Sequence, residues 1–228
     1  MKFLKIFLCL VSLILVGGII YGYSQFRGFG NNLPRERFVV ALNTSEEQII
    51  DNLYQKGFLR NKTIFNLVLD LKKWRGNTKP GAYMISKSMN VYELAGTLIY
   101  GPFQKWTVIP PGKRKEQVGL ILKKSLNWPD DMVLSFIRIA KEGYLWPDTY
   151  LFNTDADPSQ IANRLENEFN AKLGELKADF KTKNISPQTA VIMASLIERE
   201  SGSEEDKSII VGILWNRLKK KMKLEIDA

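Results

Sequence analysis

The sequence predicts an α+β fold in which a single N-terminal transmembrane helix precedes two folded regions. Three observations lead to this class. An uncharged apolar run covers residues 6–23, short β-prone segments alternate with amphipathic helical patterns between residues 38 and 122, and helical patterns recur after residue 130. With 228 residues, 45% of them hydrophobic, the chain is long enough for one large domain or two small ones.

The apolar run at residues 6–23 is long enough to span a bilayer, and two lysines precede it within residues 1–5. A cleaved signal peptide is the alternative, but no A-x-A cleavage site follows the run. The lysines favour a cytoplasmic stub at residues 1–5, although three arginines between residues 27 and 37 weaken that bias. We therefore expect a single-pass protein of the cell membrane, with a cytoplasmic N-terminus and everything after Tyr23 extracytoplasmic.

Composition excludes several kinds of chemistry. The chain has no His, and its only Cys, Cys9, lies within the apolar run. A Ser-His-Asp triad, a disulfide within the chain and the common zinc sites are therefore excluded. The formal charge of +9 is spread along the chain without a basic block interleaved with aromatics, which argues against nucleic-acid binding. Anionic lipid or an anionic polymer would account for the charge as well.

The region after the apolar run is expected to begin with a linker at residues 24–37, which carry Gly, Asn and Pro without periodicity. The elements expected next are a strand at 38–42, a helix with a T-x-x-E capping box at 44–47, a helix at about 62–74, a strand at 81–85 and a helix capped by Asn90 and Glu93. Gly101 and Pro102 mark a boundary, so residues 38–101 form one small module. Units of this strand–turn–helix kind resemble the LysM class of glycan-binding modules, and the resemblance is one of pattern.

The second region, residues 102–228, repeats the order of strand (106–109), polar turn and amphipathic helix, which is a weak internal repeat. Its most informative helix starts with Ser186 and Pro187 as N-cap and first-turn residue. At helical spacing Ala190, Ala194 and Glu198 share one stripe, which we expect to face into the fold. A carboxylate that leaves an apolar wall tends to keep its proton, which suits a proton donor. The alternative is a solvated residue near a helix C-terminus.

A second informative segment covers residues 142–152 and packs four aromatics and two carboxylates into eleven residues. One interpretation is a hydrophobic loop that fills the core. The other is an aromatic wall for a glycan, because sugar rings present apolar faces to aromatic planes while carboxylates bind their hydroxyls. The candidate residues for such a wall are Glu142, Tyr144, Trp146, Asp148 and Tyr150.

Four segments together resemble the endolytic murein transglycosylases, the YceG-like family. They are EGYLWPDTYLF at 142–152, ASLIERES at 194–201, WNRL at 215–218 and the ending at 222–228. The resemblance covers essentially the whole chain and implies a single-pass membrane enzyme that cuts peptidoglycan glycan strands internally. It implies peptidoglycan polymerases or penicillin-binding proteins as partners, with no cofactor and no metal. The family's catalytic glutamate falls on Glu198, and Asn216 and Asp227 are further candidates for substrate binding.

The inventory of carboxylates bears on the mechanism. Ordinary glycosidases use two carboxylates on either side of the bond. Glu200 points to nearly the opposite side of the helix from Glu198, which leaves Glu142 and Asp148 as possible partners. The resemblance implies a mechanism that needs only one catalytic carboxylate. Glu198 protonates the oxygen of the β-1,4 bond between N-acetylmuramic acid and N-acetylglucosamine, then deprotonates the C6 hydroxyl of the same muramic acid. The product is a 1,6-anhydro end, which terminates glycan elongation.

One departure from the family concerns the end of the chain. Family sequences continue well beyond the position of Asp227, so we expect residues 102–228 to be a C-terminally truncated catalytic domain, in a fragment or in a truncated gene product. Missing strands would expose sheet edges and part of the cleft wall. The alternative function is therefore a non-catalytic, membrane-anchored peptidoglycan-binding or scaffold protein. An ordinary two-carboxylate glycosidase is the third hypothesis.

Overall fold

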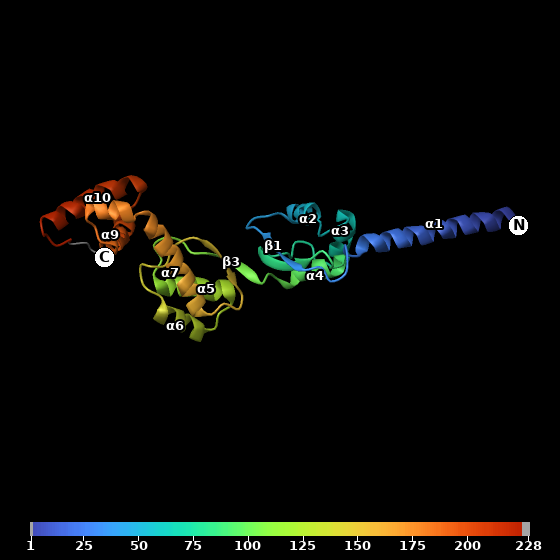
Figure 1. The fold of residues 1–228 in the computed structure, drawn as a ribbon, viewed down its shortest axis with the longest axis horizontal. Helices are drawn as coiled ribbons and strands as arrows, with labels where there is room; N and C mark the ends of the chain where they lie inside the picture. The colour runs from blue at the N-terminus through green and yellow to red at the C-terminus, as the bar shows by residue number, and fades with distance from the viewer. Residues whose placement is uncertain (1, 225–228) are drawn as a thin grey trace. The chain divides into compact units, whose positions relative to one another are not determined.

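The computed structural model describes residues 2–224, apart from the side chains of residues 2–8, 177 and 178. It is a mixed α+β structure with an N-terminal apolar helix, as the sequence predicts, and it has ten helices and four strands over the described residues (Figure 1). The chain divides into two compact units, Met1–Trp106 and Thr107–Ala228. The four strands form one sheet in the order β1-β2-β3-β4.

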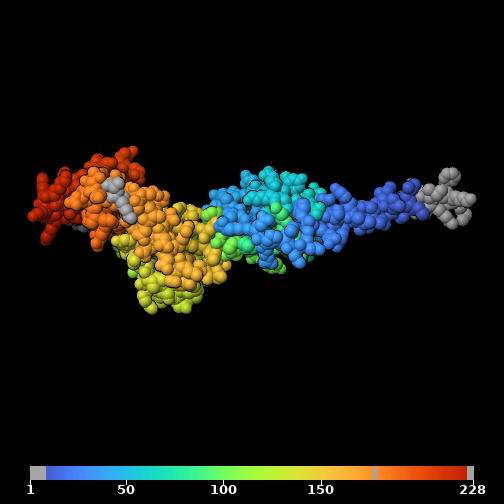
Figure 2. Space-filling model, in the orientation of Figure 1, coloured from blue at the N-terminus to red at the C-terminus, as the bar shows by residue number. Residues whose placement is uncertain are grey.

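Helix α1 (Lys2–Phe26) begins before the expected span and ends after it. Its segment Cys9–Phe26 has a mean hydropathy of 1.6, and none of it is buried in the protein. Figure 2 shows the described part of this blue helix standing clear of the rest of the first unit. The helix is long and apolar enough to cross a membrane, and a signal sequence has the same length and composition.

The first unit continues with a compact arrangement of strands and helices. Its elements are β1 (Arg35–Val40), α2 (Glu46–Gln55), α3 (Lys62–Leu71), β2 (Gly81–Ser86) and α4 (Val91–Tyr100). The two strands pair antiparallel, with Phe38 opposite Tyr83. The expected strand at 38–42 was therefore placed about three residues too late, because Arg35–Arg37 are exposed and carry no hydrophobic signal.

Helix caps in this unit follow the sequence closely. Asn90 and Glu93 form the predicted capping box at the start of α4. The capping box of α2 is made by Ser45 and Gln48, one residue later than the predicted T-x-x-E pair. Thr44 instead donates its hydroxyl to the carbonyl of Ala41, so it closes the preceding turn.

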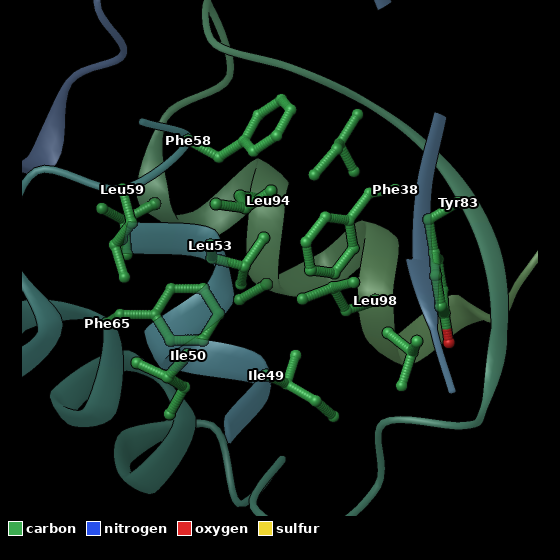
Figure 3. Packing of buried hydrophobic residues seen from close by; sticks show 14 of the residues in the cluster. Phe38, Ile49, Ile50, Leu53, Phe58, Leu59, Phe65, Tyr83, Leu94 and Leu98 are labelled. Carbon is green, nitrogen blue, oxygen red and sulfur yellow. The ribbon is translucent and has the colours of Figure 1, made fainter. Parts of the chain in front are cut away.

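The core of the first unit forms where β1 and β2 meet the inner faces of α2, α3 and α4. Figure 3 shows Phe38, Leu53 and Leu98 directed toward one another from three of these elements, and all three are buried. Burial of such side chains contributes roughly 1.5–3 kcal/mol each relative to exposure. This small cluster is thus the main source of stability in the unit.

The segment between α1 and β1 is ordered against this core, although the sequence suggested a linker. Phe26 packs against the core cluster, and the backbone N–H of Phe29 donates to the carbonyl of Lys87 over 2.7 Å. Pattern analysis missed these contacts because they are made by single residues without periodicity.

The second unit contains mostly helices. Strand β3 (Gln104–Val108) crosses the boundary between units, and its residue Gln104 pairs with Ala82 of β2. The elements that follow are α5 (Lys115–Leu126), α6 (Asp130–Ile139), β4 (Thr149–Asn153), α7 (Pro158–Glu175), α8 (Lys177–Lys183), α9 (Pro187–Glu200) and α10 (Glu204–Lys219). A second core cluster joins α5, α6, β4 and α7, and α9 packs beside α10 (Figure 1).

Candidate active site

Helix α9 carries Glu198 in its last turn. The predicted cap is present, since Ser186 accepts a hydrogen bond from the N–H of Thr189 over 3.0 Å and Pro187 occupies the first turn. The expected inward stripe is wrong. Ala194 and Glu198 are exposed, Ala190 is half-buried, and Met193 is the residue of α9 that is fully buried. Because α9 is apolar on most sides, its periodicity does not say which face packs.

Glu198 faces a lysine from the next helix. Its Oε2 lies 3.3 Å from Nζ of Lys207, which also lies 2.6 Å from Oε1 of Glu204. The pKa of Lys207 is raised above its ordinary value, first by the hydrogen bond to Glu204 and then by the hydrogen bond to and the charge of Glu198. Lys207 is therefore a cation throughout the neutral range, and its ammonium contacts both carboxylates.

The turn after β3 lies against the same carboxylate. Gly112 has φ +71°, a conformation that favours glycine, and a Cβ added there would lie 3.4 Å from Cγ and 3.8 Å from Oε1 of Glu198. The polar turn that the sequence predicts at residues 110–112 thus becomes one wall of the site. Neither Gly112 nor Lys207 was among the predicted site residues.

Glu142, the first candidate partner carboxylate, lies at the other end of the same turn. Its Oε2 accepts a hydrogen bond from the backbone N–H of Lys115 over 3.0 Å, at the start of α5. A carboxylate there is stabilised by the unpaired N–H groups of the helix. Segment 112–115 thus contacts both Glu198 and Glu142, but Glu142 already has a structural role as a hydrogen-bond acceptor at a helix N-terminus.

Loop 142–148 also touches α9. Gly143 has φ +81°, and a Cβ added there would lie 3.0 Å from Cγ1 of Val191. Val191 precedes Glu198 by two helical turns, which is about 10 Å along the axis. The structure therefore brings the predicted aromatic segment and the predicted catalytic helix together.

The aromatic candidates differ in exposure. Tyr144 and Trp146 are half-buried, and the ring of Tyr144 lies 4.9 Å from that of Phe169. Tyr150 is only 6% exposed, belongs to the second core cluster and donates its hydroxyl to the carbonyl of Trp146 over 2.8 Å. Burial raises the pKa of the Tyr150 hydroxyl. Tyr150 thus fits the core interpretation of the segment, and Tyr144 and Trp146 retain surface that a ligand can reach.

Two of the three remaining candidates lie within the described residues. Asp148 is exposed, and its Oδ1 accepts a hydrogen bond from the N–H of Thr149 over 2.6 Å, as expected for a residue that shapes a turn. Asn216 is exposed near the C-terminus of α10, about 13 Å along the axis from Lys207. Asp227 lies outside the described residues. Within residues 2–224 no three His, Cys, Asp or Glu side chains are grouped so that they could hold a metal ion.

A groove of about 610 Å³ opens on the first unit. The rings of Trp74 and Tyr92 lie 5.5 Å apart at its side, and Tyr100 at its edge is 88% exposed. Gly96 forms part of the floor, since a Cβ there would meet Tyr100 at 3.7 Å and Trp74 at 3.9 Å. Two apolar and six polar residues complete the lining: Leu33, Met89, Asn32, Arg35, Ser86, Ser88, Glu93 and Thr97. Aromatic side chains beside a few polar groups are the usual composition of a small-molecule binding site.

The fold and the site together define a class: an α+β protein with one N-terminal apolar helix and an exposed glutamate that contacts a lysine beside a glycine turn. Comparison with known proteins is more specific. The model of the YceG-like family matches residues 38–228, and the chain belongs to this family.

Two curated relatives are named endolytic murein transglycosylase. The protein of Bacillus subtilis (strain 168) is 36% identical over 111 residues, which are 46% of this chain and 30% of that protein. The protein of Streptococcus pneumoniae serotype 2 (strain D39 / NCTC 7466) is 23% identical over an alignment that covers 96% of this chain and 47% of that protein. The chain thus spans less than half the length of these relatives. A crystal structure of a YceG-like protein from Listeria monocytogenes is similar at 22% identity and a TM-score of 0.48, over 85% of this chain and 73% of that one.

Proposed function

We propose that this chain belongs to a membrane-anchored lytic transglycosylase that cuts peptidoglycan strands internally. The observation that carries the proposal is the family match over residues 38–228, together with relatives named endolytic murein transglycosylase. In this proposal residues 6–23 anchor the protein, residues 38–101 are a LysM-like glycan-binding module, and residues 102–228 contribute to the catalytic domain. Everything after Tyr23 lies outside the cytoplasm, where the glycan is.

Glu198 is the catalytic residue in this proposal. In the first step the carboxylic acid donates its proton to the glycosidic oxygen, and the bond from that oxygen to C1 of the muramic acid breaks. In the second step the carboxylate takes the proton of the C6 hydroxyl, and O6 closes on C1 to form the 1,6-anhydro ring. The proton count balances, and the glutamate ends as it began. Exposure of Glu198 beside the Gly112 turn supports this role, because a polymer must reach the carboxylate from outside.

Lys207 bears on the first step. Proton donation needs the acid form of Glu198, so the contact with the Lys207 ammonium at 3.3 Å has to open when substrate binds. Glu204 offers Lys207 a second partner at 2.6 Å, so a sugar that enters beside Glu198 can leave Lys207 paired with Glu204. In the second step the ionised carboxylate is required, and Lys207 supports it.

The test is digestion of purified sacculi followed by mass spectrometry of the soluble muropeptides. The proposal expects anhydro ends, and Glu198→Gln lowers their rate of formation by at least about a hundredfold. Glu200→Gln is the matched control, since it removes a neighbouring exposed carboxylate from the same helix. Reducing ends in place of anhydro ends would instead indicate a two-carboxylate glycosidase. Equal product from Glu198→Gln would rule out its catalytic role.

A second candidate function is glycan binding without turnover, and the groove on the first unit favours it. An exposed Tyr100, a Trp74–Tyr92 pair and a glycine floor suit a stacked sugar ring. The test is retention of the chain on sacculi. Tyr100→Ala is expected to weaken retention about tenfold, in line with loss of one stacking contact. Tyr54→Ala removes an exposed tyrosine outside the groove and serves as the control. Retention without release of fragments would identify a scaffold protein.

Association with peptidoglycan polymerases is part of the same proposal. An enzyme that ends growing strands acts where they emerge, so it should lie near the polymerase. Crosslinking in intact cells, with the anchored chain as bait, is the test. If the chain crosslinks to no polymerase and still cuts nascent glycan, the proposed association with a polymerase is wrong.

A further inference from the structure

The chain that leaves α1 is fastened to the first unit from both sides. On one side Gly28 lies so close to residues 87–88 that an added Cβ would overlap the carbonyl oxygen of Ser88, and the N–H of Phe29 donates to the carbonyl of Lys87. On the other side Nη2 of Arg60 donates to the carbonyl of Gly28 over 3.2 Å. The globular part therefore follows the end of the apolar helix within a few residues and without a free linker.

Apolar side chains are exposed at this junction. Phe29 is 43% exposed and Leu33 is 39% exposed, both within seven residues of Phe26, the last residue of α1. The guanidinium of Arg60 lies 4.3 Å from the centre of the Phe29 ring. Such a stacked pair presents a charge and an apolar ring side by side, the combination found where proteins meet a lipid interface.

Arginines at the junction have no acidic counterpart. The sequence contains no Asp or Glu before Glu36. Among the residues that the structure describes, no carboxylate lies within 4.0 Å of the side chain nitrogens of Arg27, Arg35 or Arg60. Lys87 differs, because Glu36 lies 3.8 Å from its Nζ. No carboxylate neutralises any of these three arginines, so each can attract anionic oxygens, Arg60 through the N–H groups that do not donate to the Gly28 carbonyl.

We infer that the juxtamembrane face formed by Arg27, Phe29, Leu33, Arg35 and Arg60 binds the anionic headgroup layer of the membrane that α1 enters. The inference rests on the proposed anchoring by α1. The three guanidinium groups pair with lipid phosphates, while Phe29 and Leu33 enter the boundary between headgroups and acyl chains. The first unit is then held against the bilayer by its own surface as well as by its helix.

The experiment uses the full chain in lipid vesicles and measures the depth of one residue. Cys9→Ser removes the native thiol, and Leu33→Cys receives an environment-sensitive dye. Quenching by lipids that carry a spin label near the headgroup is compared in vesicles of phosphatidylcholine alone and in vesicles that also contain phosphatidylglycerol. Leu42→Cys is the reference position, because it is 43% exposed and lies beyond the far end of β1, roughly 20 Å away.

The expected result is strong quenching at residue 33 and little at residue 42, with more quenching at residue 33 when phosphatidylglycerol is present. Arg27→Gln with Arg60→Gln should lower the ratio of docked to undocked protein about fivefold for each cation. Lys124→Gln with Arg138→Gln removes the same amount of charge from α5 and α6, and it should leave the ratio of docked to undocked protein unchanged. Equal quenching at residues 33 and 42 would overturn the inference. So would quenching at residue 33 that changes neither with the arginine substitutions nor with phosphatidylglycerol.

A dye at Ile14→Cys distinguishes failure of the docking face to bind lipid from failure of α1 to enter the membrane. Ile14 is 70% exposed within the apolar helix, so it should be quenched by spin labels deep in the acyl chains. Deep quenching at residue 14 without headgroup quenching at residue 33 overturns the docking face alone. Absence of quenching at residue 14 overturns the anchor and, with it, the inference.

Discussion

Glu198 and Lys207 face each other across the short connection between α9 and α10, with Oε2 of the glutamate 3.3 Å from Nζ of the lysine. Both side chains keep substantial exposure, 41% and 32%. An ion pair at this exposure is worth about 1 kcal/mol or less. The pair is therefore weak enough to be opened by a substrate.

Replacement of Lys207 should slow glycan cleavage. Lys207→Met removes the ammonium that lies 3.3 Å from Oε2 of Glu198, and the second step needs a carboxylate there, so we expect the rate of anhydro-end formation to fall by up to about fivefold, in line with an exposed ion pair. Lys207→Arg keeps the charge and should leave the rate unchanged. The measurement is the rate of anhydro-end formation from sacculi. A rate for Lys207→Met that equals that of the unsubstituted chain would show that the pair does not act in catalysis.

Substitution of Gly112 should affect both the backbone of the turn and the neighbouring side chain of Glu198. Gly112→Ala meets a positive φ, so we expect a loss of about 1 kcal/mol in stability. Its methyl group would also lie in van der Waals contact with Cγ of Glu198, at 3.4 Å, so we expect lower activity because it fills space beside the carboxylate. Gly57→Ala is the matched control, because its φ of +72° is the same and no atom lies within 4 Å of the added Cβ. Thermal unfolding and the rate of anhydro-end formation are measured for both. Equal loss of activity in the two variants would assign the effect to backbone strain alone.

The sequence predicts the fold class and the starts of helices well, because a helix cap depends on residues that are close together in the sequence. Asn90 with Glu93, and Ser186 with Pro187, were assigned correctly from residue type and spacing. The face that α9 buries could not be predicted in the same way. Val191, Ile192, Met193, Leu196 and Ile197 occupy several sides of the helix, so only tertiary contact decides that Met193 is buried and Ala194 is exposed.

In the candidate site, too, the sequence predicts local features but not the contacts between distant segments. Glu198 was predicted from its segment and from a family resemblance, and its catalytic role stays a prediction. Lys207 and Gly112 come from other elements, and their sequence contexts, a polar helix start and a Pro-Pro-Gly turn, occur in many proteins without function. Contacts between segments that are far apart in the sequence leave no periodic trace in a single chain. The packed junction at residues 26–29 escaped prediction for the same reason.

Tyr83 should make the first unit sensitive to alkaline pH. Burial raises the pKa of its hydroxyl to about 12, although the hydrogen bond to the carbonyl of Lys79 opposes the shift. An unfolded tyrosine ionises near pH 10, so its stabilising contribution is complete below that pH and is lost as the pH rises toward about 12. Denaturant unfolding at a series of pH values, followed by tryptophan fluorescence, measures this. Tyr83→Phe should flatten the decline, whereas the exposed Tyr100→Phe should not.

Gly28→Ala tests whether the chain between α1 and β1 is fastened or free. The added methyl group would overlap the backbone of Ser88, which cannot move aside without breaking the hydrogen bond from Phe29 to Lys87. We therefore expect release of the segment and cleavage by trypsin after Arg27 at least about tenfold faster, since local opening governs proteolysis. Gly30→Ala is the control, because its methyl group would meet only the flexible side chain of Leu33 at 3.5 Å. The same variant should lower headgroup quenching at residue 33, because a released segment no longer holds Arg60 and Phe29 together. Equal cleavage of the two variants would mean that residues 27–34 are a linker after all, and the docking face would lose its structural basis.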